Sequence, residues 1–89
     1  MATVNLIVKG QVQGVFFRAS NKEKADEMGI KGFVRNEMNG DVYIEAEADQ
    51  AQLTEFMSWC KHGPRKAIVE SCFVEEGNVI GFTEFAIQR

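Results

Sequence analysis

Hydrophobic residues recur along the chain with two different periods, and residues 42–48 give the clearest pattern. Apolar and polar side chains alternate strictly there, as in a β-strand with one buried face and one face in water. The apolar members are Val42, Ile44, Ala46 and Ala48. Asn39-Gly40, just before this segment, is typical of a two-residue hairpin turn. The pattern predicts a strand at 42–48 whose polar members, including Glu45 and Glu47, face solvent.

Four more segments have the apolar and β-branched composition of strands. Residues 3–9 form an almost continuous apolar run that ends at Gly10, which favours a central strand. The other three segments are 32–36, 67–75 and a short one at 83–87. Together with 42–48, these segments predict five strands.

Two segments have the helical period instead. Residues 18–28 carry Ala25 and Met28 on one face, and Gly29 follows, where a left-handed residue commonly ends a helix. The second helix is predicted to begin after Asp49, with Gln52 placed to complete a capping box, and to end before Gly63-Pro64. Its apolar stripe consists of Leu53, Phe56, Met57 and Cys60.

The order of these elements is βαββαβ with a short fifth strand at the end, which is the ferredoxin-like arrangement. We therefore expect an α+β sandwich in which an antiparallel sheet carries both helices on one face. In this arrangement the first two strands are parallel, with the third between them, so their C-terminal ends lie at the same edge. The loop at 10–18 is then expected to lie close to Asn36. Taken alone, Asn36 better suits a turn position in which its side chain caps its own backbone. The expected position of Arg18 across the sheet edge favours a functional role instead.

Composition indicates a globular protein with a single domain, residues 1–89. Hydrophobic residues make up 45% and charged residues 26% of the 89 positions. The formal net charge is −3 and no basic stripe is visible, which argues against a nucleic-acid partner. No segment is long enough to span a bilayer, so no membrane partner is indicated, and the N-terminus lacks the features of a signal peptide. The size favours a monomer.

The two cysteines, Cys60 and Cys72, form no CxxC pair, so neither a disulfide framework nor a zinc site is indicated. Buried free thiols in a reducing compartment are the expected state, which favours the cytoplasm. Glu47 and Asp49 form no ligand set with the single His62. We therefore expect no metal and no cofactor.

The stretch GQVQGVFFRAS at 10–20 carries the candidate chemistry. A glycine-containing turn that leads into a helix presents successive backbone N–H groups, and the helix start adds partial positive charge. Arg18 in the first turn is slightly unfavourable at that positive end unless an anion is held there, and its guanidinium matches two phosphate oxygens. The alternative is a tight turn at Gly10 and Gly14, with Arg18 as a solvated charge. No GK[ST] follows, so this is not a Walker loop.

Two longer motifs, one of which contains these residues, resemble the signatures of a known family. GQVQGVFFR, together with GFVRNEMNGDV at 32–42, closely resembles the two signatures of the acylphosphatase family, G-x-V-Q-G-V-x-F-R and G-x-V-x-N-x-x-[DN]-G-x-V. GPRKAIVES at 63–71 is similar to a further recurrent segment of that family. The resemblance covers essentially the whole chain, and it implies the same ferredoxin-like sandwich.

The resemblance also implies a function, the hydrolysis of a small acyl phosphate substrate to a carboxylate and inorganic phosphate. It implies that Arg18 and Asn36 are catalytic, with Arg18 binding the phosphate and Asn36 holding the attacking water. It further implies that the phosphate is cradled by the backbone N–H groups of Gln13, Gly14, Val15, Phe16, Phe17 and Arg18.

An acyl phosphate makes modest demands on a catalyst. Its leaving group is a carboxylate whose conjugate acid has a pKa of about 4, so no general acid is required. The catalyst must mainly position the reactants and stabilise charge, which an arginine and several N–H donors can do without a metal. The alternative is a non-catalytic module that binds a small anion, or acyl or carbamoyl phosphate, because a fold alone does not decide function.

Overall fold

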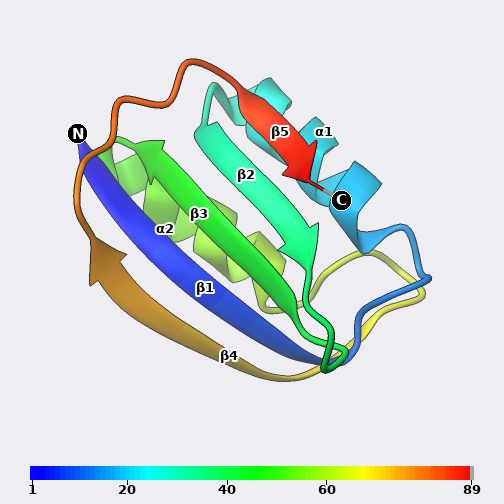
Figure 1. The fold of residues 1–89 in the computed structure, drawn as a ribbon. Helices are drawn as coiled ribbons and strands as arrows, with labels where there is room; N and C mark the ends of the chain where they lie inside the picture. Colours follow the sequence, from blue (N-terminus) through cyan, green and yellow to red (C-terminus); the bar gives the residue numbers. More distant parts are fainter. Residues whose placement is uncertain (89) are drawn as a thin grey trace.

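Five strands and two helices follow one another in the predicted order in the computed structural model, which describes residues 1–88 (Figure 1). The strands are β1 (Ala2–Gln11), β2 (Lys31–Asn36), β3 (Val42–Ala48), β4 (Ile68–Gly77) and β5 (Phe85–Gln88). The helices are α1 (Phe17–Met28) and α2 (Gln50–Cys60). Within the described residues, neither helix is long and apolar enough to cross a membrane.

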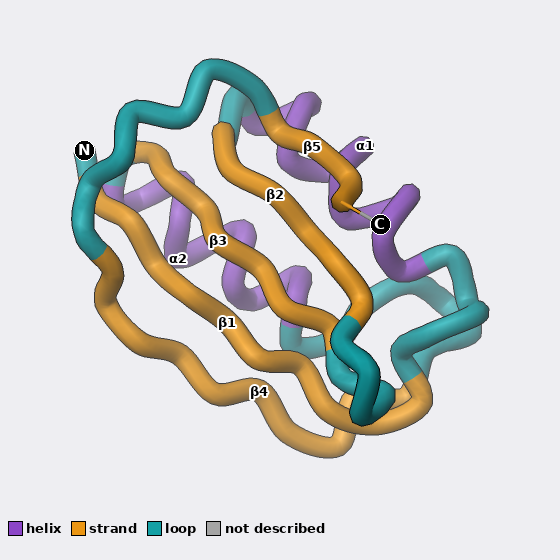
Figure 2. Tube along the Cα trace, viewed as in Figure 1, coloured by secondary structure: helices purple, strands orange, loops and turns teal. Residues whose placement is uncertain are grey.

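The strands form one sheet in the order β4-β1-β3-β2-β5. Neighbouring strands are antiparallel, apart from β2 and β5, which run parallel. Both helices lie against one face of this sheet, and the other face carries no helix (Figure 2). The predicted ferredoxin-like sandwich is confirmed, and β1 and β2 end at the same edge, on either side of β3.

The hydrophobic core lies between the sheet and the helices, as the two periods predict. The alternating apolar residues of β3 are buried, and so are Leu53, Phe56 and Cys60 of the α2 stripe. Phe85 of β5 packs edge-on against Phe56, with 6.0 Å between the ring centroids. Burying a side chain of this size contributes about 1.5–3 kcal/mol. The short last strand is therefore held by the core as well as by its pairing with β2.

Gly29 and Gly10 were both predicted to end an element, and the prediction is confirmed for Gly29 only. Gly29 ends α1 with a φ of 72°, as predicted, and Ile30 N donates to Ala25 O at 2.8 Å. Gly10 does not end β1, which continues to Gln11. It has a φ of 131°, and a Cβ there would collide with the carbonyl oxygen of Ile68 in β4. Gly10 therefore serves the close approach of β1 and β4 rather than the turn that follows.

The start of α2 differs from the predicted capping box. Asp49 precedes the first helical residue, but its side chain accepts no capping hydrogen bond. Gln52 Nε2 donates instead to the backbone oxygen of Met28 at 2.8 Å. That carbonyl lies at the C-terminal end of α1, where carbonyl groups lack helical partners. The prediction was wrong because the fold offers Gln52 an acceptor on the other helix, which the local sequence does not reveal.

Glu47 is the largest departure from the sequence-based expectation, because its side chain is buried rather than solvated. The residue is 2% exposed. One carboxylate oxygen accepts hydrogen bonds from Ile80 N–H at 2.6 Å and from Thr3 Oγ1 at 2.7 Å. The other accepts from the N–H groups of Gly81 at 2.9 Å and Phe82 at 3.0 Å. The loop between β4 and β5 therefore covers this end of the helix-free face.

These hydrogen bonds favour the charged form of Glu47. The N–H of Ile80 has the largest effect, followed by the hydroxyl of Thr3, and together they lower the pKa of the carboxyl below its ordinary value although burial acts in the opposite direction. Phe82 adds an apolar contact, with its ring edge-on to Phe33 at 6.0 Å between centroids. The carboxylate and this ring pair fix the loop that leads into β5.

Both cysteines are free thiols, as predicted. Cys60 is fully buried, accepts a hydrogen bond from Asn21 Nδ2 at 3.3 Å, and has a thiol pKa that burial raises. Cys72 is only half-buried. The expectation of buried thiols therefore holds for Cys60 and not fully for Cys72.

Candidate functional site

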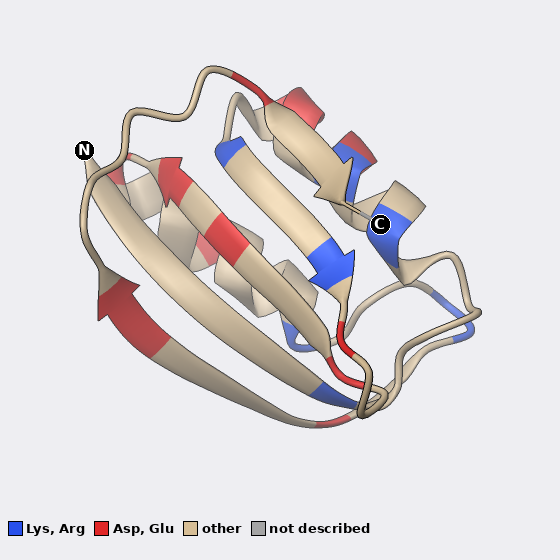
Figure 3. Cartoon of the chain, in the orientation of Figure 1, with Lys and Arg blue, Asp and Glu red and all other residues tan. Residues whose placement is uncertain are grey.

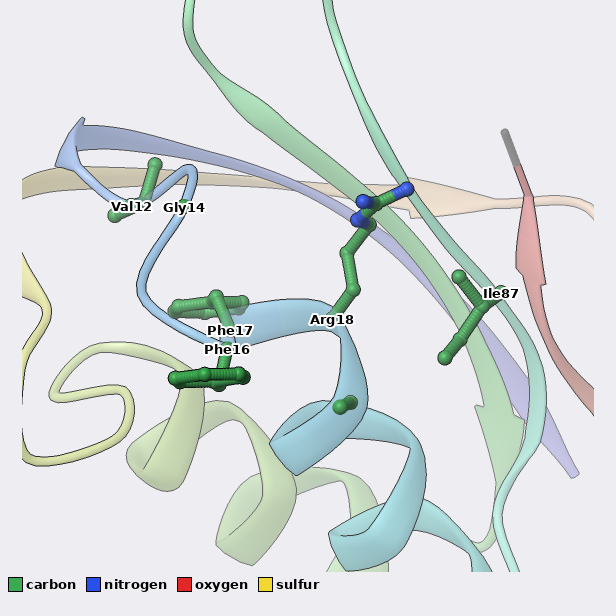
Figure 4. A pocket seen from close by; sticks show the side chains of 7 residues that line it. Val12, Gly14, Phe16, Phe17, Arg18 and Ile87 are labelled. Carbon is green, nitrogen blue, oxygen red and sulfur yellow. The ribbon is translucent and has the colours of Figure 1, made fainter.

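Residues 12–16, which connect β1 to α1, form what we call the site loop. Buried side chains hold both of its ends, because Val12 and Phe17 are each 1% exposed. Phe17 packs against Trp59 of α2, with ring centroids 5.7 Å apart. Between these supports Gly14, at the bend of the loop in Figure 4, has a φ of 73°. Apart from Gly14 and its two chain neighbours, no atom lies within 4 Å of where a Cβ would be. The loop is therefore a curl with open space at its bend.

Phe16 stands in an unusual conformation at the end of this loop. It is the N-cap residue of α1, with a φ of 63° and a ψ of 23°, a left-handed geometry that costs a non-glycine residue about 1–2 kcal/mol. Its side chain is 73% exposed, whereas Val15 and Phe17 pack against the core. Anchoring therefore comes from Val15 and Phe17. Strained residues of this kind cluster at functional sites.

The backbone N–H groups of Gln13 to Arg18 are free to serve as donors. Within the described residues, none of them donates to a backbone or side-chain acceptor. The first hydrogen bond of α1 runs from Ser20 N to Phe16 O at 3.0 Å, which leaves the earlier N–H groups without helical partners. The first turn contains no acidic residue. A row of such donors at a helix start suits an anion.

Arg18 projects from the first turn of α1. Figure 4 shows its side chain extending away from the rings of Phe16 and Phe17, with Ile87 on its other side. Its Nη1 lies 3.4 Å from the backbone oxygen of Gln88, a long and therefore weak hydrogen bond. In residues 1–88, no Asp or Glu lies within ion-pair distance of this guanidinium. Its positive charge is thus available to an anion. Figure 3 shows basic residues in the helix that Figure 1 labels α1.

Asn36 is the last residue of β2, where it pairs with Val42 of β3. Its Oδ1 is buried and accepts no hydrogen bond from the described part of the chain. A buried polar atom without a partner costs about 1–3 kcal/mol, so its presence calls for an explanation. With Oδ1 turned inward, Nδ2 is the end of this amide that is left for an outside partner.

Two contacts bring the site loop, Arg18 and Asn36 to the same edge of the sheet. Gln13 Nε2 donates to the backbone oxygens of Glu37 at 2.7 Å and Asp41 at 2.9 Å, which ties the site loop to the turn that follows Asn36. Arg18 meets Gln88, whose register partner in β2 is Arg35, the residue before Asn36. The expected proximity of the loop to Asn36 is therefore observed, and the two side chains do not lie at opposite ends of the sheet.

A cavity of about 270 Å³ lies beside Arg18. Its lining includes Val12, Gly14, Phe16, Phe17, Arg18 and Ile87. One guanidinium therefore stands among mostly apolar side chains and the backbone of the site loop. Such a mixture suits a small molecule with an anionic group and an apolar remainder.

The sequence did not indicate the contribution of β5 to this site. Ile87 lines the cavity and the carbonyl of Gln88 accepts from Arg18, yet both lie far along the chain from the site loop. They arrive there because β5 pairs in parallel with β2. No local pattern encodes that pairing. The side chain of Gln13 was missed for the same reason, because its acceptors lie on a distant turn.

Across residues 1–88, no group of three or more His, Cys, Asp and Glu side chains is arranged to hold a metal ion. The polar groups at the site are instead a guanidinium, amides and backbone N–H groups.

The matching family model, a relative and two solved structures that resemble this chain all carry the same family name. The family model named Acylphosphatase matches residues 4–87. A protein named acylphosphatase from Methylococcus capsulatus is 44% identical over 90 residues, which cover 100% of this chain and 98% of that protein. The crystal structure of acylphosphatase from Bacillus subtilis superposes with a TM-score of 0.96 at 33% identity, covering 100% of both chains. An acylphosphatase structure from Coxiella burnetii gives a TM-score of 0.94 at 33% identity, covering 98% of this chain and 92% of that one.

Proposed function

Because the chain belongs to the acylphosphatase family and is a hydrolase of acyl phosphates, we propose that it works through the N–H groups of residues 13–18, Arg18 and Asn36. The single observation that carries this assignment is the convergence at one sheet edge of unbonded N–H groups, an arginine without an acidic partner in residues 1–88, and an amide with a buried, unpaired oxygen.

The phosphate of the substrate lies in the curl of the site loop in this proposal. The N–H groups of residues 13–18 and the guanidinium of Arg18 donate to its oxygens. These donors are in place before the substrate arrives, because Val12 and Phe17 fix the ends of the loop in the core. Donors held in position stabilise the charge that develops on the equatorial oxygens in the transition state without any reorganisation.

Asn36 holds the attacking water. Nδ2 of Asn36 donates to the water oxygen, whose second lone pair forms the new bond to phosphorus while the bond from phosphorus to the carboxylate oxygen breaks. The carboxylate leaves with that electron pair and needs no proton, because it is a weak base. The water proton ends on the inorganic phosphate or in solvent. No step in this sequence requires a metal ion.

The alternative, a module that binds an acyl or carbamoyl phosphate without releasing products, differs in one measurable respect. Such a module would bind phosphate and show no turnover. The curated relatives are named acylphosphatases, which favours the enzyme.

We also propose that residues 1–89 act as one domain and that the protein is a cytoplasmic monomer, with neither a nucleic acid nor a membrane as partner. The net charge of −3 and the two free thiols support this assignment. Light scattering at several protein concentrations tests the monomer. A mass that doubles with rising concentration would contradict it.

The decisive experiment measures hydrolysis of benzoyl phosphate in the presence of a chelator. Wild-type protein is expected to turn over unchanged by the chelator. Arg18→Ala is expected to lose at least about 10³-fold in kcat/KM, the low end for removing an arginine that stabilises phosphoryl transfer. Arg18→Lys keeps the charge without the planar fork and should fall between the two.

Three results would contradict this assignment. Near-normal turnover by folded Arg18→Ala, shown by an unchanged circular dichroism spectrum, removes Arg18 from the mechanism. Loss of wild-type activity in chelator, restored by a divalent ion, removes the metal-free mechanism. Asn36→Ala is expected to lose about 10²-fold in kcat, the scale for one positioned catalytic donor, so a normal kcat removes Asn36.

A further inference from the structure

The side chain of Gln13 makes a contact that the phosphate-binding role of its backbone does not use. Its Nε2 donates to two carbonyl oxygens, that of Glu37 at 2.7 Å and that of Asp41 at 2.9 Å. Both acceptors belong to the turn between β2 and β3, which is distant from Gln13 in sequence. One amide group therefore connects the site loop to the turn that begins directly after Asn36.

The turn on the far side of this bridge is a closed unit. Glu37 N donates to Asp41 O at 2.8 Å, and Gly40 N donates to Glu37 O at 3.2 Å. Within the turn, Asp41 N donates to Asn39 Oδ1 at 3.0 Å. Gln13 therefore binds the two carbonyls at the base of the turn, where β2 ends and β3 begins. Moving these carbonyls relative to the site loop would break the bridge.

Asn36 depends on its backbone for its position. Its side chain makes no hydrogen bond with residues 1–88, and its Oδ1 is buried without a partner. The sheet connects it to β1 through Val42 and Val8, across the whole width of β3. The bridge from Gln13 to Glu37 is the short connection from the site loop to the residue next to Asn36.

We propose that Gln13 is a positioning residue that sets the distance between the phosphate and the attacking water. This inference rests on the proposed function. The backbone N–H of Gln13 serves the phosphate, while its side chain fixes Asn36, which holds the water, through the carbonyl of the next residue. A single residue thereby controls both reactants in the in-line attack.

Phosphate binding and the positioning of the attacking water should respond differently to the loss of this bridge. Phosphate binding depends on backbone donors whose supports, Val12 and Phe17, remain buried. The water depends on Asn36, and a displacement of about 1 Å from the reactive geometry can cost about 10²-fold in rate. Removing the Gln13 amide should therefore lower kcat by about 10-fold to 10²-fold and change the inhibition constant of inorganic phosphate by less than about threefold.

A double-mutant cycle separates this role from a merely structural one. Gln13→Met keeps the length of the side chain and removes its donor. If Gln13 acts through Asn36, Gln13→Met costs its full factor in the wild-type background and less than about threefold in Asn36→Ala, because the two effects are coupled. The same factor in both backgrounds would overturn the proposal.

Two further variants keep the test decisive. Gln13→Asn retains an amide that is one methylene too short to span the same gap, so it should lower kcat as Gln13→Met does, and it serves if the methionine variant does not fold. Asn39→Ala removes two hydrogen bonds inside the turn, both between Asn39 and Asp41, and leaves the bridge, so its effect on kcat should be smaller than that of either Gln13 variant. A larger effect of Asn39→Ala would show that turn stability, rather than the bridge, matters.

Failure of this inference can be distinguished from failure of the proposed function. If Asn36→Ala alone has a normal kcat, the role of Asn36 is wrong and the function must be reassigned. If Asn36→Ala loses about 10²-fold and Gln13→Met costs the same in both backgrounds, only the positioning role is wrong.

Discussion

The loop after β1 and the loop before β5 both present consecutive backbone N–H groups. They differ in whether those N–H groups have a hydrogen-bond acceptor. Those of Ile80, Gly81 and Phe82 donate to the buried carboxylate of Glu47. Those of residues 13–18 donate to no acceptor in the described part of the chain. The anion for the loop before β5 is Glu47 of β3, so the donors of that loop are satisfied. The loop after β1 has Arg18 beside it and no anion, and in the proposed function a substrate supplies one.

If the proposed function holds, the same backbone chemistry serves stability at the loop before β5 and catalysis at the site loop. A carboxylate held by several N–H groups satisfies donors that would otherwise be unpaired. The same donors held open retain their capacity for a phosphate, and the loop must then be rigid for another reason. The buried Val12 and Phe17 provide that rigidity at the site loop. The predictions below test whether the two loops really differ in this way.

Of the effects that test this comparison, the largest is expected when a carboxylate is added to the site loop itself. Gly14→Asp places an anion beside the open N–H groups, at a position where a side chain has space and where Asp tolerates the left-handed conformation. Gly14→Asn has the same shape without charge. Because a like charge close to phosphate repels it by several kcal/mol, kcat/KM for benzoyl phosphate should be at least about 10²-fold lower in Gly14→Asp than in Gly14→Asn. Equal values would contradict the idea that these donors bind the anion.

The second effect concerns removal of the Glu47 carboxylate, which accepts hydrogen bonds from the loop before β5. Glu47→Gln replaces a carboxylate oxygen, which accepts hydrogen bonds, by an amide NH2 group, which cannot accept them from the backbone N–H groups. Its thermal unfolding midpoint should fall by roughly 4–8 °C or more, the scale for losing one net hydrogen bond in a domain of this size. Turnover of the folded protein should change little, because Glu47 lies at the other end of the sheet. An unchanged midpoint would show that the carboxylate does not hold the loop.

Glu47 should also make stability depend on pH in one direction. Its hydrogen bonds lower the pKa of the folded carboxyl below its unfolded value, which is about 4.3 for glutamate. Its contribution to stability is therefore fully present above that unfolded pKa and is lost as the pH falls through the folded pKa. The difference in unfolding midpoint between wild type and Glu47→Gln should be constant near neutral pH and shrink in acid. A difference that grows in acid would contradict this assignment.

The smallest effect concerns backbone strain in the site loop. Phe16→Asn replaces an exposed ring in the left-handed conformation by a residue that tolerates it and that suits an N-cap. The free energy of unfolding, measured by denaturant titration, should rise by about 1 kcal/mol. Phe16→Val, which is β-branched and remains strained, serves as the control and should not be more stable than wild type. A loss of stability in Phe16→Asn would mean that the ring itself supports the loop.

The sequence predicted those features that a local pattern can encode. The alternation at 42–48 and the stripe at Leu53, Phe56 and Cys60 gave the two faces of the core correctly. The order of elements then placed the site loop and Asn36 at one edge, because connectivity limits how such a sheet can be arranged. Gly29 was predicted from the conformation that its position requires.

The remaining features depend on partners that are distant in sequence. Glu47 sits in a regular alternation, and nothing near it signals that a loop more than thirty positions away will donate three N–H groups to it. Gln52 matches a capping box, yet it donates to the other helix. The side chain of Gln13 likewise finds its acceptors on a separate turn. The hydrogen-bond partner of a polar side chain is set by which groups the folded chain brings close to it. When those groups are distant in sequence, the local pattern cannot predict the partner.

The parallel strand β5 has a practical consequence for anyone who purifies this protein. Gln88 lies against the guanidinium of Arg18, so a polyhistidine tag fused directly after Gln88 would emerge next to the proposed site. A tag before Met1 would emerge at the opposite end of β1, about 30 Å away for a ten-residue strand. Assays are therefore best made with the affinity handle at the amino end.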